Sequence, residues 1–152
     1  MREVALRLLA VRSRSCAELR AQLRRRGFEP SAIKDELARL EELGLVDDVR
    51  LALAWARYRL ESRPMGRFAL RRDLLGRGLE GEVVERALEA AYAERPEAEW
   101  ARRAAQKKLA SLRGERRFER LGAFLKRRGF ADGLALEVCR ELLGTEELPR
   151  EE

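Results

Sequence analysis

The fold is decided by a hexapeptide that occurs three times: LRRRGF at residues 23–28, LLGRGL at residues 74–79 and LKRRGF at residues 125–130. Successive copies lie 51 positions apart and align without an insertion. Repetition at about this period is typical of proteins built from stacked supersecondary units. The chain is therefore interpreted as three copies of one unit. The recurring positions are Leu19, Leu23, Gly27 and Phe28, then Leu70, Leu74, Gly78 and Leu79, then Leu121, Leu125, Gly129 and Phe130.

Each hexapeptide has the pattern of a helix C-terminus. Its glycine suits the left-handed residue that follows a helix, and the apolar residues on either side make the hydrophobic contact of a Schellman motif. In the first copy Gly27 is that glycine, and Phe28 would contact Leu23. Ser15 and Glu18 predict a capping box where the same helix begins.

The rest of each copy also has helical spacing of apolar residues. We expect an opening helix at 2–12, connector helices at 48–63 and 97–113, and Cys139 in the core because it aligns with Leu37 and Leu88. Val, Ile and Thr are scarce, which disfavours sheets. The prediction is an all-α, elongated or curved tandem array of three three-helix, helix-turn-helix-like repeats. The expected divisions are 1–47, 48–96 and 97–144, followed by an acidic tail at 145–152.

Composition narrows the function of the 152-residue chain. The formal net charge is +6, and there is no histidine, which removes imidazole catalysis and most zinc and haem ligation. Two cysteines make no disulfide framework. No apolar run is long enough to span a membrane, and the N-terminal residues carry charges where a signal peptide would be apolar. We expect a cytoplasmic protein without catalytic residues, metal, cofactor or membrane contact.

The positive charge is concentrated in two stretches. Residues 49–72 hold seven Arg and one Glu, and residues 100–128 hold eleven Arg or Lys and two Glu. An ion-paired surface would explain such a composition without a ligand, but each stretch has few carboxylates of its own. Contact with a polyanion is the favoured interpretation, through phosphates and without sequence specificity.

Residues 15–48 also allow a more specific interpretation, the DNA-binding helix-turn-helix motif of a transcription factor. In that motif the second helix carries the base-reading residues. Here the second helix reads EPSAIKDELARLEEL and is acidic. The acidic second helix argues against this alternative.

With the repeats in view, the sequence resembles the RecX family, small regulators of the bacterial RecA recombinase. The resemblance covers nearly the whole chain. It rests on SCAELRAQLRRRGF, LARLEELGLVDDVRLALAWARYRL, RPMGRFALRRDLLGRGL and FLKRRGF. In these stretches the family pattern maps to Ser15, Glu18, Leu19, Leu23, Gly44, Leu45, Val46, Asp47, Asp48, Ala54, Trp55, Arg63 and Gly66.

The resemblance implies a non-enzymatic negative modulator that lies in the groove of the RecA filament on single-stranded DNA. Such a protein suppresses ATP hydrolysis, strand exchange and coprotease activity, and so acts in DNA repair, recombination and the SOS response. We expect a monomer that binds RecA and single-stranded DNA, with double-stranded DNA as a further ligand. The candidate contact residues are Arg57, Arg63, Arg67, Arg71 and Arg72 in one patch, and Arg102, Arg103, Lys107, Lys108, Arg116, Arg117, Arg120, Lys126 and Arg127 in the other.

Two rival functions stay open at this point. A sequence-nonspecific nucleic-acid-binding repeat protein would bind strands without regulating a recombinase. A helical scaffold for other proteins would bind neither filament nor DNA, and its arginines would be ion-paired.

Overall fold

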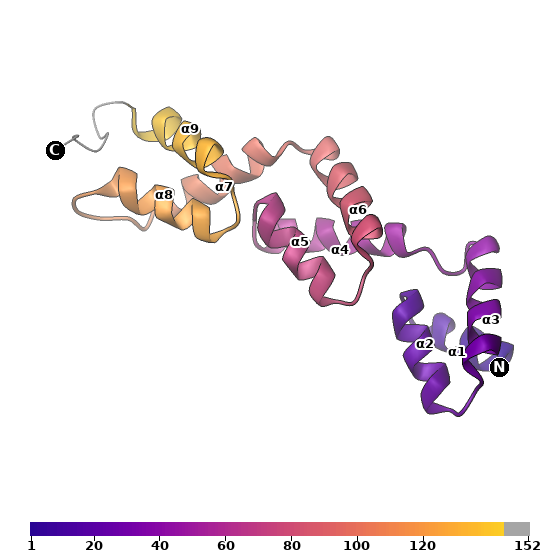
Figure 1. The fold of residues 1–152 in the computed structure, drawn as a ribbon. Coiled ribbons are helices and arrows are strands. Elements are labelled where there is room, and N and C mark those ends of the chain that lie inside the picture. Colours follow the sequence, from indigo (N-terminus) through magenta and orange to yellow (C-terminus); the bar gives the residue numbers. More distant parts are fainter. Residues whose placement is uncertain (145–152) are drawn as a thin grey trace.

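The computed structural model describes residues 1–144, and over these residues it contains nine helices and no strand. The predicted acidic tail at 145–152 lies outside the described residues. The helices form an elongated row with α1–α3 at one end, α4–α6 in the middle and α7–α9 at the other end (Figure 1), which we call the first, second and third modules. The all-α array is confirmed. The helices are α1 (Arg2–Val11), α2 (Cys16–Arg25), α3 (Pro30–Glu42), α4 (Asp48–Ser62), α5 (Arg67–Gly76), α6 (Gly81–Glu94), α7 (Glu97–Leu109), α8 (Arg117–Arg127) and α9 (Asp132–Leu143).

The repeated glycines end helices as predicted. Gly27, Gly78 and Gly129 have φ angles of 83°, 82° and 85°, a left-handed conformation that glycine adopts without the penalty imposed by a Cβ. The amides of Gly27 and Phe28 donate back into the last turn of α2, and those of Gly129 and Phe130 do the same in α8. These are the two hydrogen bonds of a Schellman motif.

Side chains cap the starts of α2 and α4. The Ser15 hydroxyl accepts from the Glu18 amide at 3.1 Å and the Glu18 carboxylate accepts from the Ser15 amide at 3.4 Å, which confirms the capping box. Asp47 caps α4 by accepting from an amide one turn ahead at 3.1 Å. Its neighbour Asp48 instead accepts from the Cys16 amide at 3.0 Å and so ties the start of α4 to α2.

Within residues 1–144 the buried side chains form two hydrophobic cores, not three. One core lies within the first module and includes Leu19, Leu23 and Ile33. The other is continuous from Ala52 in α4 to Cys139 in α9, so the second and third modules share it. The predicted division into three domains therefore remains a proposal.

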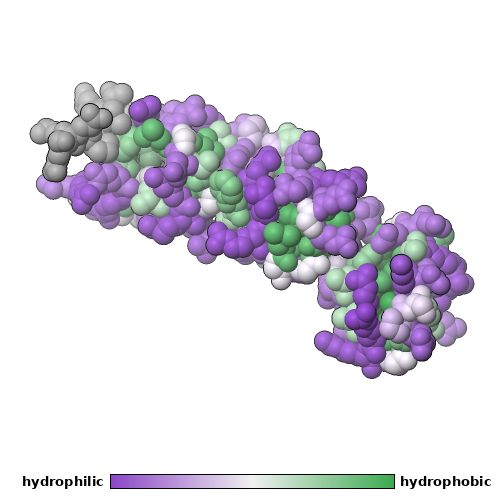
Figure 2. All heavy atoms as spheres, viewed as in Figure 1, coloured by the Kyte–Doolittle hydropathy of each residue, from purple (hydrophilic) through white to green (hydrophobic). Residues whose placement is uncertain are grey.

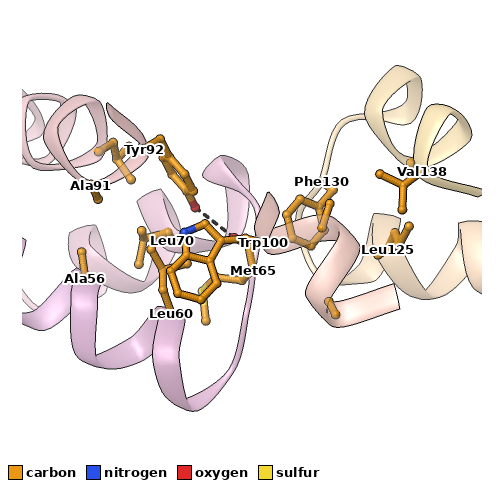
Figure 3. Close-up of a cluster of buried hydrophobic side chains, with 14 of the residues drawn as sticks. Ala56, Leu60, Met65, Leu70, Ala91, Tyr92, Trp100, Leu125, Phe130 and Val138 are labelled. Atoms are coloured by element: carbon orange, nitrogen blue, oxygen red, sulfur yellow. Dashed lines mark hydrogen bonds between the residues drawn. The ribbon is translucent and has the colours of Figure 1, made fainter. Parts of the chain in front are cut away.

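The shared core crosses the boundary between the second and third modules through aromatic residues. Figure 3 shows Trp100 beside Leu60 and Met65, with Phe130 on the side toward the third module. Trp100 is 4% exposed. The Tyr92 hydroxyl donates to the Met65 carbonyl at 3.0 Å, which satisfies a polar group inside this core.

At the same boundary two backbones touch directly. The Gly66 amide donates to the Arg128 carbonyl at 2.8 Å. A Cβ on Gly66 would overlap the carbonyl of Gly129, and a Cβ on Gly129 would overlap Ala69. Both positions therefore require glycine for close packing, and at Gly129 this adds to the requirement of the helix end.

One predicted helix is shorter than expected. The connector expected at 97–113 ends at Leu109, because the amide of Leu112 bonds to the carbonyls of both Lys108 and Leu109 and tightens the last turn. Gly114 then takes a φ of 86°. Leu112 stays buried, so the apolar spacing was correct for the core but wrong for the helix end.

The cysteines lie as expected. Cys139 is fully buried, Cys16 is half-buried, and both are free thiols. Within residues 1–144, no helix combines the length and apolar character needed to cross a bilayer.

Candidate nucleic-acid interface

Three cations converge where the second module meets the third. Arg63 is the C-terminal cap of α4, Lys108 lies in the last turn of α7, and Arg128 is the C-terminal cap of α8. Each therefore sits at the negative end of a helix dipole, which favours a positive side chain. We call Arg63, Lys108 and Arg128 the junction cluster.

Aromatic and backbone groups hold this cluster in place. Two of the cations lie against the Phe124 ring, with the Lys108 Nζ 5.2 Å and the Arg128 Cζ 4.8 Å from its centroid. Nη1 of Arg128 also donates to the Pro64 carbonyl at 3.3 Å, next to Arg63. The cluster is thus assembled from helices that are far apart in the sequence.

The electrostatics of the cluster favour an anionic ligand. Burial lowers the pKa of the Arg128 guanidinium, and the nearby charge of Arg63 lowers that pKa further. No carboxylate of the described residues forms an ion pair with Arg63, Lys108 or Arg128. Phosphate oxygens would supply the missing negative charge, and arginine binds phosphate well because its planar fork can donate two hydrogen bonds.

Several of the other candidate cations are already paired with carboxylates. Arg57 bonds to Glu94 and Arg71 to Glu85, both on α6. The remaining pairs are Arg102 with Glu141 at 2.8 Å, Arg103 with Glu61 at 3.2 Å, Arg116 with Glu119, and Lys126 with Asp132 at 3.8 Å.

These pairs correct an argument made from the sequence. Each basic stretch has few carboxylates of its own, but α6 and α9 pack alongside and bring carboxylates to Arg57, Arg71 and Arg102. The inference that ion pairing cannot account for the charge was therefore wrong for these residues. Exposed pairs of this kind are weak and are screened by salt. Their arginines can exchange a carboxylate for a phosphate at modest cost.

Other candidates form no ion pair within residues 1–144. These are Arg63, Arg67, Arg72, Lys107, Lys108, Arg120 and Arg127. Arg67 has its Cζ 5.6 Å from the centroid of the Tyr92 ring, and Arg120 donates to the Arg113 carbonyl at 2.6 Å. Arg117, the first residue of α8, is half-buried.

The sequence-based list omitted one member of the junction cluster, Arg128. It aligns with Arg26 and Arg77 in the repeat, and the sequence pattern indicates only that it lies at a helix end. The signal that distinguishes it, the neighbouring Arg63 and Phe124, exists only in three dimensions. Lys107 and Arg127 adjoin the cluster in sequence and are exposed.

The two thiols of the chain are not activated as nucleophiles. Burial and a hydrogen bond to Glu41 raise the pKa of the Cys16 thiol to about 12. Burial also raises the pKa of Cys139, which is fully enclosed. Both cysteines are therefore protonated near neutral pH and unreactive as nucleophiles.

Comparison with known proteins identifies the family. A model of the first three-helix domain of RecX matches residues 2–40, and a model of the second three-helix domain of RecX matches residues 47–88. The chain belongs to the RecX family. The resemblance inferred from the sequence is thereby confirmed.

Relatives within the RecX family match along almost the whole chain. The regulatory protein RecX of Streptomyces coelicolor is 36% identical over 148 residues, covering 95% of this chain and 78% of the relative. That of Chlorobaculum tepidum is 36% identical over 144 residues, covering 93% and 88%. This chain is thus a member of a family of regulatory proteins.

A crystal structure of RecX from Lactobacillus salivarius has the same fold. It superimposes with a TM-score of 0.79 at 20% identity and covers 92% of each chain. The row of three-helix units is therefore the architecture of a RecX protein and not a feature of this sequence alone.

Proposed function

We propose that this protein is a negative modulator of the RecA recombinase. It binds in the groove of the RecA filament on single-stranded DNA and inhibits ATP hydrolysis, strand exchange and coprotease activity. It acts in the cytoplasm, in DNA repair, recombination and the SOS response, without catalysing a reaction itself. It works as a monomer, and double-stranded DNA is a further ligand.

The observation that carries this proposal is the junction cluster in a member of the RecX family. Three cations without carboxylate partners among residues 1–144 face one region of the surface, and an elongated row of modules can follow an extended polymer. Phosphate contacts of this type give affinity without reading sequence. That suits a filament which forms on any single strand.

The test is to titrate the protein into a RecA ATPase assay on single-stranded DNA. A recombinase regulator slows hydrolysis when it is substoichiometric to RecA. A nonspecific nucleic-acid-binding protein slows it only at high dose, by competing for the strand. A scaffold for other proteins has no effect at any dose. Either of the last two results would overturn the proposal.

The phosphate contact has its own test. The double variant Lys107→Glu with Lys108→Glu should weaken binding to a single-stranded oligonucleotide. It should also reduce the slope of log affinity against log salt by about 1.4, or about 0.7 for each lost contact. The matched control is Arg7→Glu with Lys34→Glu, which makes the same charge change at exposed sites of the first module. If the two double variants weakened oligonucleotide binding equally, net charge and not the junction cluster would determine binding.

A further inference from the structure

An exposed stripe on α5 differs from the rest of the basic surface. Phe68 is 57% exposed and Leu75 is 45% exposed, and Arg72 lies between them in the sequence and is also exposed. Their spacing of i, i+4 and i+7 places all three on one face of the helix. We call Phe68, Arg72 and Leu75 the α5 stripe. Figure 2 shows hydrophobic surface in the middle of the row, where Figure 1 places α5.

The stripe occurs in the second module alone among the three repeats. The 51-residue offset aligns its positions with Ala17, Ala21 and Arg24 in the first module, and with Glu119, Ala123 and Lys126 in the third. The fold of a module therefore does not require large apolar residues here. Scattered apolar residues on a surface are normal, but two of them aligned around a cation on one helix face suggest a contact site.

Arg72 differs from the other arginines near the stripe, most of which are paired. Arg71 bonds to Glu85, Arg59 bonds to Asp73 at 2.6 Å, and Arg77 lies 3.4 Å from Asp73. No carboxylate within residues 1–144 pairs with Arg72. An arginine left unpaired between two apolar anchors is complementary to a carboxylate set in an apolar groove.

The local chemistry favours a protein partner over a nucleic acid. Glu85 and Asp73 neutralise the arginines around the stripe, so this face attracts phosphate less than the junction cluster, whose cations pair with no carboxylate within residues 1–144. Leu75 has no π-face on which a base could stack. Anchors spaced at i, i+4 and i+7 are typical of a helix that lies in a groove of another protein, and in the α5 stripe the apolar anchors are Phe68 at i and Leu75 at i+7.

We infer that the α5 stripe is the surface that docks on protein, and that it lies in an apolar groove with a carboxylate placed to meet Arg72. This rests on the proposed function, under which the partner is a subunit of the recombinase filament. The two parts of the basic surface then have different tasks. The junction cluster contacts phosphate, and the α5 stripe contacts the recombinase.

The experiment compares binding of the full chain to a RecA filament and to the same single-stranded oligonucleotide without RecA. Phe68→Ala with Leu75→Ala should weaken filament binding roughly 10- to 100-fold, because buried anchors of this kind dominate interface affinity. Affinity for the free oligonucleotide and its salt dependence should stay unchanged. The matched control is Leu6→Ala with Leu43→Ala, which removes two exposed leucines of the first module and should leave both affinities unchanged.

A photo-crosslinking benzoylphenylalanine at position 68 gives a second readout. Crosslinks to the RecA polypeptide support the inference. Crosslinks to the oligonucleotide overturn it, as does filament binding by the Phe68 and Leu75 double variant within twofold of the unaltered protein. If the unaltered protein neither binds the filament nor slows its ATP hydrolysis, the proposed function fails and this inference fails with it. Measurements on the unaltered protein therefore distinguish failure of the proposed function from failure of this inference alone.

Discussion

Replacing Gly66 with alanine tests the packing between the second and third modules. The added Cβ would overlap the Gly129 carbonyl. Moving the two backbones apart to relieve this overlap would also disturb the 2.8 Å hydrogen bond from the Gly66 amide to the Arg128 carbonyl. Neither side can yield easily, because both contacting groups are backbone.

The expected loss follows from these two contacts. Forcing an extra carbon into a packed interior costs about 1–3 kcal/mol, and a lost hydrogen bond costs about 1 kcal/mol more. The variant should therefore lose about 2–4 kcal/mol of unfolding free energy. That is a large share of the roughly 5–15 kcal/mol typical of a folded protein, and it lowers the melting temperature by roughly 4–16 °C.

The assay is urea unfolding followed by circular dichroism, with Gly76→Ala as the matched control. A Cβ on Gly76 meets nothing within 4 Å, and this position ends α5 with ordinary dihedral angles. Because alanine favours a helix over glycine, the control should gain about 0.5–1 kcal/mol. The two identical substitutions are thus expected to have opposite signs. Equal stability of Gly66→Ala and the unaltered protein would refute the close contact.

Further outcomes are expected at four other sites. Ser15→Ala removes the capping box of α2 and should cost about 1 kcal/mol in the unfolding of the first module, measured by urea titration. Tyr92→Phe leaves the buried Met65 carbonyl without its donor and should cost roughly 1–3 kcal/mol by the same measurement. Asp48→Asn keeps an oxygen for the Cys16 amide but removes a carboxyl whose pKa is raised by burial and by Glu41, Glu80 and Asp47. Ionisation of that carboxyl opposes folding, so Asp48 makes wild-type stability fall as pH rises from the ordinary aspartate pKa through the raised one. The unfolding free energy of Asp48→Asn should lack this decrease when the variant and the wild type are each measured at pH 4 and pH 7. Cys16 should react with iodoacetamide at pH 8 roughly 10- to 100-fold more slowly than an ordinary thiol, because its raised pKa lowers the thiolate fraction while the higher nucleophilicity of that thiolate offsets part of the loss, and rapid alkylation of the folded chain would contradict this.

The features that the sequence predicted are local or periodic. The left-handed glycines, the capping box at Ser15 and the burial of Cys139 each follow from residues within a few positions or from the 51-residue offset. Short-range spacing determines such features because a helix repeats every few residues. They were therefore accessible before the structure.

The features that the sequence could not predict depend on contacts between distant residues. Arg102 meets Glu141, which is 39 positions away, and Arg103 meets Glu61, which is 42 positions away. The contact of Gly66 with Gly129 has no periodic signal either. Pairing along one helix is visible in a sequence, whereas pairing between helices depends on how they pack. For this reason the charge count located the basic surface but did not separate its paired arginines from the junction cluster.

The two boundaries between modules are packed differently, because one lies within a shared core and the other lies between two separate cores. Between the second and third modules, backbone lies on backbone and the core is continuous. Between the first and second modules, the contacts include the hydrogen bond from Cys16 to Asp48, and a cavity there is lined by Arg12, Trp55 and Arg77 among others. The three repeats are equally spaced in the sequence, but the two boundaries between them are not equally well packed. A partner that bends the row is expected to bend it where α4 begins, because the six helices from α4 to α9 share one core.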